Sequence, residues 1–480
     1  MVSRQRFANG TRQNKSRAIR RCEDKRQSFM RTFVDFERWL MGFRVMTDEL
    51  EEDADESRPQ LSPAEARAED RSLPSLRERI RQAFARLPFA NVVGRTLGEQ
   101  STRAALYTFW LTRTIIIVIF LLTGQIKVMP DPVNPGVVDS YLSLRRIPVS
   151  RILTEEAQTA DANWYMTIAA NGYERRAFEN TTHHDWAFFP LYPLLLRAAS
   201  WVTSEFTLTG MLISHLFFFF ALILLHKTAL AFGLDAEAAG RAILYLAIFP
   251  VSYFFSLPVT ESLFLLLTTA SFYFAKRERW WIAGLCGALA SATRLTGILL
   301  LPALAVLYWQ TYRHFWPPRK SLLALCLVPT GLFGFMIYLH AITGNALAFK
   351  DSLAAWGRTT GFFLMPLLRY IRHPLVLIGP WNPYFLNFWA ATITLVCGLV
   401  LLRRRAYALA CYTLLSAFVA LSSVLLQSQA RYAMVVFPTF MVLATWGRNT
   451  SVDTFVRTVS LVLLSLMTAL FAAHFSIAMS

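Results

Sequence analysis

The sequence is short of charge and of paired cysteines, and each shortage excludes a class of protein. Only 16% of its 480 residues are charged, whereas a soluble globular protein has about one quarter. Its five cysteines form no CxxC pair and four of them lie in apolar stretches, so we expect neither a disulfide framework nor a zinc site. No apolar core follows the basic start, so a cleaved signal peptide is not expected either.

Long apolar runs take the place of charge. Hydrophobic residues make up 55% of the chain, with runs such as Ala105–Val128, Leu212–Leu225 and Val459–Ala478. About 20 helical residues cross the hydrocarbon core, where a helix satisfies its own backbone. We therefore predict an all-α polytopic membrane protein with about eleven spans. They lie at roughly 105–127, 207–228, 239–256, 260–276, 280–296, 297–312, 321–343, 384–402, 406–426, 431–447 and 456–478.

The formal net charge of +17 would suit a nucleic-acid-binding protein, but its distribution argues against one. In the membrane portion the cations stand in short clusters between apolar runs, as in cytoplasmic loops. The four clusters are Lys227 with Arg241, Lys276 to Arg279, Arg313 to Lys320, and Arg403 to Arg405. We expect a cytoplasmic N-terminus, an extracytoplasmic C-terminus and two large outer loops, at about 128–206 and 344–383.

Residues 1–104 differ in composition from residues 105–480, which we assign to the transmembrane domain. The first part is basic and an acidic stretch, Asp48–Glu56, follows it. Arg31–Met46 and Leu76–Leu87 could form amphipathic helices on anionic lipid. The alternative is a loosely ordered cytoplasmic tail.

The first outer loop carries an acid at the start of a predicted helix. Asp161 precedes Trp164 and Tyr165 by three and four residues, so the three share one helix face. Gly172 is placed to end the helix. This pattern predicts a carboxylate held at the lip of the membrane.

A second segment, His183–Pro193, contains two histidines and two prolines. We predict a short helix over Leu191–Val202, lying at the outer surface because it is too short to span. His183 and His184 could bind phosphate or a metal, or they could belong to a solvated loop.

One acid and several arginines mark other outer helix ends. Glu261 follows Thr260 within apolar sequence. Either it takes part in the function, or it is an acid at a helix N-terminus that the helix dipole stabilises. The cations are Arg294, Arg431, Lys350, Arg358, Arg369 and Arg372. As a set they would suit an anionic phosphate at the membrane boundary, although any one of them could snorkel to lipid headgroups.

Four blocks in order carry a family resemblance: Asp161–Tyr173, Trp186–Pro193, Pro250–Phe264 and Arg431–Phe440. A lesser match, Phe349–Arg358, ends in WGR. From about Thr108 onward the chain resembles the second mannosyltransferase of the GPI-anchor pathway (the PIG-V family) and its bacterial relatives, which are GT-C glycosyltransferases.

This resemblance implies a polyprenyl-phosphate-mannose donor and an inverting transfer to a lipid, glycan or protein hydroxyl on the extracytoplasmic face. It implies that Asp161 is the catalytic base, although Ala160 stands where the family usually has Trp. The residues predicted to bind donor or acceptor are Trp164, Tyr165, Tyr173, His184, Trp186, Glu261, Arg294, Arg358, Arg431 and Tyr432.

The chemistry needs only one carboxylate. A phosphate leaves without being protonated, so arginines around it suffice, and one base takes the acceptor's proton. The outer loops hold no dense acidic cluster, so we expect no metal and no other cofactor. The alternative function is a transporter or flippase of a lipid-linked substrate, which predicts ionisable groups at mid-span and paired broken helices. A third interpretation is a scaffold subunit whose active site has lost its activity.

Overall fold

The computed structural model describes residues 99–129, 141–144, 149–158, 161–203, 205–313, 319–372, 384–423, 426–473 and 475. Both predicted amphipathic helices of the tail lie outside these residues, as does Ala160. The predicted domain boundary at 104 therefore stays a prediction.

The regular elements among the described residues are helices and one hairpin, which the sequence did not predict. Its strands β1 (Ile126–Met129) and β2 (Tyr141–Leu144) pair antiparallel. The helices are α5 (Gln100–Gly124), α6 (Val149–Ala157), α7 (Ala162–Asn171), η1 (Asp185–Ala187), α8 (Leu191–Thr203), α9 (Phe206–Ala231), α10 (Ala236–Ala247), η2 (Ser252–Ser256), α11 (Glu261–Lys276), α12 (Trp280–Ser291), η3 (Leu295–Leu299), α13 (Leu300–Tyr312), η4 (Lys320–Leu327), α14 (Thr330–Thr343), α15 (Ala348–Asp351), η5 (Ser352–Trp356), α16 (Met365–Arg372), α17 (Tyr384–Arg403), α18 (Tyr407–Leu421), α19 (Gln429–Met434), α20 (Phe437–Trp446) and α21 (Thr450–Ala472).

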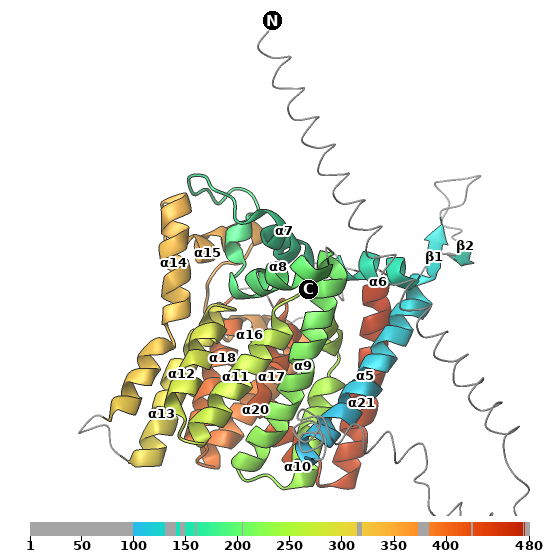
Figure 1. The fold of residues 1–480 in the computed structure, drawn as a ribbon. Coiled ribbons are helices and arrows are strands. Elements are labelled where there is room, and N and C mark those ends of the chain that lie inside the picture. Colours follow the sequence, from blue (N-terminus) through green and yellow to red (C-terminus); the bar gives the residue numbers. More distant parts are fainter. Residues whose placement is uncertain are drawn as a thin grey trace, which may run out of the picture. The chain divides into compact units, whose positions relative to one another are not determined.

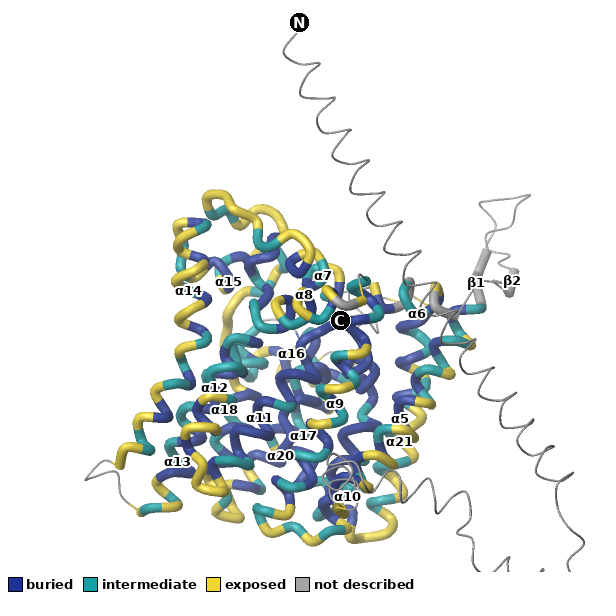
Figure 2. Tube along the Cα trace, in the orientation of Figure 1, coloured by how far each residue is buried: buried dark blue, intermediate teal, exposed yellow. Residues whose placement is uncertain are grey.

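The prediction of a helical multi-pass membrane protein is confirmed. Within the described residues, six helical segments are long and apolar enough to cross a membrane: α5, α9, η3 with α13, η4 with α14, α17 and α21. They expose large apolar side chains, including Trp110, Leu216, Phe333 and Leu399, as lipid-facing helices do. Figure 2 shows exposed positions along these helices.

The other five predicted spans are shorter helices: α10, α11, α12, α18 and α20. The prediction of one continuous span over 239–256 is wrong, because α10 ends at Ala247 and the 3-10 turn η2 follows. Apolar composition cannot distinguish a straight span from a broken one, since both bury the same side chains.

The four predicted basic loops meet at one end of the bundle. Arg448, after α20, pairs with Asp235 at the start of α10 at 2.5 Å. Arg404 donates to Thr445 at 3.0 Å, and the Arg405 carbonyl accepts from Gln310 at 3.3 Å. Helix α11 begins at Glu261 and ends at Lys276, which belongs to one of these loops. Glu261 therefore lies at the opposite end of the bundle, where Figure 1 shows α7, α8 and α15.

A buried arginine fixes the break between α10 and α11. Arg113 of α5 is 1% exposed and donates to the Ala247 carbonyl at 3.0 Å and the Ser252 carbonyl at 2.9 Å. It also donates to the hydroxyls of Ser252 and Ser256, each at 3.1 Å. These carbonyls belong to a helix end and a turn, where the backbone has no helical partner.

Replacing this arginine with an apolar side chain should destabilise the fold. Arg113→Leu removes four buried hydrogen bonds, two to carbonyls and two to hydroxyls, each contributing about 0.5–1.5 kcal/mol or more. We expect a lower thermal unfolding midpoint in detergent. Arg103→Leu, at an exposed position of the same helix, is the control and should change little; equal midpoints for the two variants would contradict this role.

Candidate active site

Helix α7 carries the predicted base, and Asp161 occupies the N-cap position of this helix. Backbone angles of φ −68° and ψ −17° are already helical there, and the carboxylate caps none of the helix's own N–H groups. Gly172 ends α7 with φ +79°, a left-handed value that glycine adopts without strain. Asp161, Trp164 and Tyr165 all line one cavity, which confirms the predicted shared face.

A chain of alternating charges joins three distant parts of the sequence. Arg431 donates through Nη1 to Asp161 Oδ2 at 2.5 Å and through Nε to Glu261 Oε1 at 2.5 Å. Arg294 Nη1 donates to the same Glu261 oxygen at 2.9 Å. Glu261 is 0% exposed, and its other oxygen has no hydrogen-bond partner among the described residues. Glu261 therefore both begins α11 and holds two guanidinium groups in place.

A third guanidinium completes the cluster. Arg358, from the second outer loop, donates to the Tyr432 hydroxyl. The guanidinium carbons of Arg294 and Arg358 lie 5.4 Å and 5.7 Å from the centre of the Tyr432 ring. With three arginines against two carboxylates, the cluster keeps a net positive charge.

The surrounding charges decide the ionisation of Asp161. Burial raises the pKa of this carboxyl, but the charge and hydrogen bond of Arg431, together with Arg358 and Arg294, lower it by more. The pKa is thus held below its ordinary value, so the group is ionised at neutral pH. Its side chain is 38% exposed, which leaves it accessible from the cavity.

The cavity has a volume of about 1080 Å³, at the upper end for small-molecule sites. Seven of the predicted site residues line it: Asp161, Trp164, Tyr165, Arg294, Arg358, Arg431 and Tyr432. Lys350 and Asp351 line it as well. On another side it reaches apolar surface of α17 and α18, including Ala391, Ala417 and Val419. A ligand with a charged group and an apolar portion fits such a lining.

Aromatic rings from both outer loops close the cavity. Trp164 stacks on Phe188 with ring centres 5.5 Å apart, and Trp356 packs edge-on against Trp164 at 6.1 Å. His183 contacts the Trp356 ring at 4.5 Å. The two long loops predicted to be external therefore contact each other beside the cavity, although nearly 200 residues separate Trp164 from Trp356 in the chain.

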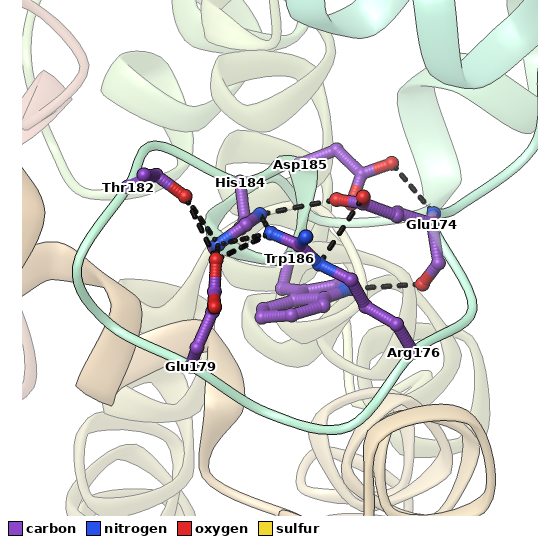
Figure 3. A network of polar contacts seen from close by, with 7 residues as sticks. All are labelled: Glu174, Arg176, Glu179, Thr182, His184, Asp185 and Trp186. Atoms are coloured by element: carbon purple, nitrogen blue, oxygen red, sulfur yellow. Dashed lines mark hydrogen bonds and ion pairs between the residues drawn. The ribbon is translucent and has the colours of Figure 1, made fainter.

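Tyr173, His184, Trp186 and Glu261 were predicted to bind donor or acceptor, but none of them is among the residues that line this cavity. His184 and Trp186 are 2% and 0% exposed and stack on each other at 4.2 Å. Trp186 donates to the Glu174 carbonyl at 3.0 Å, and Tyr173 donates to the Phe188 carbonyl at 2.6 Å. The protein covers both faces of the Trp186 ring, so this side chain has no free surface for donor or acceptor; Figure 3 shows it inside a polar network.

Sequence reasoning missed other cavity residues. Thr394, Tyr412 and Ser416 lie on α17 and α18 and line the cavity. They stand inside apolar runs with no local motif, so only helix packing reveals them. Among the described residues, no group of three or more His, Cys, Asp or Glu side chains could hold a metal ion.

The fold and the site together define an integral multi-pass membrane protein with an ionised carboxylate among arginines at one end of its helices. Residues 105–339 match the family model described as mannosyltransferase (PIG-V). The matched range contains Asp161, Glu261 and Arg294, whereas Arg358 and Arg431 lie beyond it. The resemblance seen in the sequence is thereby confirmed.

One curated relative is the GPI alpha-1,6-mannosyltransferase 2 of Cricetulus griseus, 26% identical over 230 residues. The match spans 42% of this chain and 44% of that relative's length. Among solved structures, ArnT from Cupriavidus metallidurans bound to undecaprenyl phosphate is similar with a TM-score of 0.43 and 13% identity, over 77% of this chain and 74% of that one. AglB from Archaeoglobus fulgidus, in complex with an inhibitory peptide and a dolichol-phosphate, has a TM-score of 0.39 and 11% identity, over 75% and 56%.

Proposed function

We propose that this protein is a membrane glycosyltransferase that transfers mannose, with inversion, from a polyprenyl-phosphate-mannose donor to a hydroxyl acceptor. The match of residues 105–339 to the mannosyltransferase (PIG-V) family model supports the reaction class. The observation that carries the mechanism is one ionised carboxylate, Asp161, in a cavity with three arginines.

In the proposed reaction the acceptor oxygen attacks the anomeric carbon of the donor. The bond from that carbon to the phosphate oxygen breaks, and polyprenyl phosphate leaves with its electron pair. The acceptor proton passes to Asp161. Arg294, Arg358 and Arg431 stabilise the charge that develops on the phosphate, and a positioned base contributes roughly 10²–10⁴-fold.

The pairing of Asp161 with Arg431 has a role in this scheme. A lowered pKa keeps the carboxylate ionised but makes it a weak base. A donor phosphate that forms an ion pair with the Arg431 guanidinium would compete with Asp161 for this partner. The carboxylate would then become more basic once donor is bound, which couples donor binding to activation of the acceptor.

We propose that the site faces the extracytoplasmic side. The four basic loops lie at the opposite end of the bundle from Glu261, and such loops are normally cytoplasmic. A polyprenyl chain would then lie in the bilayer with its phosphate at headgroup level. Labelling of a cysteine at position 161 from outside intact cells tests this; labelling only from inside would overturn it.

The function itself can be tested with purified full-length protein. Radiolabelled polyprenyl-phosphate mannose, supplied with membrane lipids and glycans as acceptors, should yield a labelled product in detergent. A transporter or flippase would move labelled donor across vesicles and form no product, and a scaffold subunit would do neither.

One prediction concerns the arginine that does not pair with a carboxylate. Arg358→Gln removes positive charge near both the donor phosphate and Asp161. We expect kcat/KM for donor to fall about tenfold or more, the scale of one charged hydrogen bond at about 1.5–3 kcal/mol. Because this charge helps to lower the pKa of Asp161, the acid limb of the pH profile should also move to higher pH.

Arg369→Gln is the matched control, since this residue belongs to the same outer loop and does not line the cavity. It should leave both the donor kcat/KM and the acid limb unchanged. If Arg358→Gln behaved in the same way, Arg358 would have no part in donor binding.

A further inference from the structure

The helix that carries Arg431 is too short to hold its own position. Helix α19 has six residues, and a helix shorter than about 12–15 residues has little stability of its own. Residues 427–432 nevertheless supply five of the side chains that line the cavity of the candidate active site. The neighbours of this segment must therefore fix it, and they decide where the Arg431 guanidinium lies.

The turn that leads into α19 contains a strained residue. Ser428 is the N-cap of α19 and has φ +58°, a left-handed value that residues other than glycine rarely adopt. It is 4% exposed, and its carbonyl accepts from the Tyr432 N–H at 3.0 Å. Such a conformation persists only where the surrounding structure imposes it.

A buried amide on another helix holds both ends of this turn. Asn387 lies near the start of α17 and is 0% exposed. Its Nδ2 donates to the Leu426 carbonyl at 3.0 Å, and its Oδ1 accepts from the Ala430 N–H at 2.8 Å. Ser428 stands midway between Leu426 and Ala430, so one side chain spans the strained turn.

Arg431 is thus held at both of its ends. Its backbone follows directly after Ala430, which Asn387 binds, and its guanidinium donates to Asp161 and Glu261, each at 2.5 Å. The Asp161 side chain is 38% exposed whereas Glu261 is fully buried. If the backbone of α19 shifted, the contact with Asp161 would therefore weaken first, because water can replace the guanidinium there.

We propose that Asn387 is a positioning residue, which holds the turn before α19 so that the Arg431 guanidinium reaches Asp161. Asn387 does not line the cavity, so it acts through Arg431 and not on a ligand. That this position matters for mannosyl transfer rests on the proposed function. That Asn387 places a guanidinium beside residue 161 does not.

The first test measures the position of Arg431 without any transfer reaction. Asp161→Cys in the full-length protein puts a thiol where the carboxylate was, and nearby arginines lower the pKa of a thiol. Its rate of alkylation by iodoacetamide at pH 7, followed by mass spectrometry of the peptide, reports the ionised fraction. Adding Asn387→Leu should slow this alkylation about three- to tenfold, because an opposite charge within about 4–6 Å shifts a pKa by about 1–3 units.

Asn387→Ser keeps the test decisive if the leucine variant does not fold. A serine in a helix can donate to the carbonyl three residues earlier, as Ser291 does to Ala288 at 2.9 Å, so its hydroxyl need not stay unsatisfied. It is too short to span the turn. We expect it to slow the alkylation to the same extent.

Ser271→Ala is the matched control, made in the same Asp161→Cys protein. Ser271 is 0% exposed and donates to the Ala283 carbonyl at 2.9 Å, so this variant also loses a buried hydrogen bond between two helices. It lies ten residues after Glu261 on α11, about 15 Å away along the helix. The rate of alkylation should stay unchanged.

The second test uses Asn387→Ser with Asp161 in place. We expect kcat/KM for polyprenyl-phosphate mannose to fall about tenfold, the scale of one charged hydrogen bond. The acid limb of the pH profile should move to higher pH, because Asp161 loses part of the charge that lowers its pKa.

Alkylation at the unaltered rate in Asn387→Ser, or equal slowing in Ser271→Ala, would overturn the positioning role. Slower alkylation in Asn387→Ser alone supports it, even from a protein that transfers no mannose. In that last case the proposed function fails while Asn387 still positions Arg431, so the two failures are distinguishable.

Discussion

Asp161→Asn is expected to lower mannosyl transfer by at least the roughly 10²–10⁴-fold that general-base catalysis contributes, while the protein still folds and binds donor. The amide oxygen can still accept from Arg431, so the geometry of the cluster survives, but the amide cannot take a proton from the acceptor. Turnover of labelled donor by purified protein measures the effect, and donor binding is measured separately by equilibrium titration.

Asp235→Asn is the matched control for this variant. Asp235 also stands at the start of a helix and pairs with an arginine, Arg448, at 2.5 Å, but at the opposite end of the bundle. It should keep full turnover. Normal turnover in Asp161→Asn would refute the base assignment, and loss of both turnover and folding would make Asp161 a structural residue.

Glu261→Ala should be the most destabilising single change in the site. It leaves Arg294 without its carboxylate and Arg431 with only Asp161, in a place where Glu261 itself is fully buried. Removing one partner of a buried pair costs about 3–5 kcal/mol, because the remaining charge is left uncompensated. The thermal unfolding midpoint in detergent should fall markedly, and transfer should fall with it as Arg431 loses its position.

The contrast is an exposed pair elsewhere in the chain. Glu237 lies opposite Arg241 and is 86% exposed, so Glu237→Ala should cost about 1 kcal/mol or less. Equal midpoints for the two variants would mean that the buried cluster adds nothing to stability, and Glu261 would be only an acid at a helix N-terminus.

Local patterns predicted the parts of the site that depend on nearby residues. The spacing of Asp161, Trp164 and Tyr165 and the position of Gly172 gave α7 its face and its end, since a helix is defined by neighbours a few residues apart. The short helix α8 was predicted for the same reason. Lys and Arg clusters likewise grouped the loops at one end of the bundle, because each loop carries its own charge.

Partnerships across the chain could not be obtained in this way. The sequence left Glu261 between a functional acid and an acid at a helix N-terminus. The structure shows it at the start of α11, paired with Arg294 and Arg431, and its part in the reaction stays a prediction. His184 and Trp186 carry residue types that suit ligand binding, yet packing buries them in the loop's own network. A residue type states what a side chain can do, whereas its neighbours in space decide what it does.

The sequence by itself determined a multi-pass helical membrane protein that resembles the mannosyltransferases of the PIG-V family, with a candidate base in its first long loop. Apolar run length and short motifs are local properties, so they can be read directly. Only the tertiary structure brought Arg431 to Asp161 across 270 residues and set Arg294 and Arg358 beside them. These contacts depend on how helices pack, and packing is decided by the whole set of side chains together.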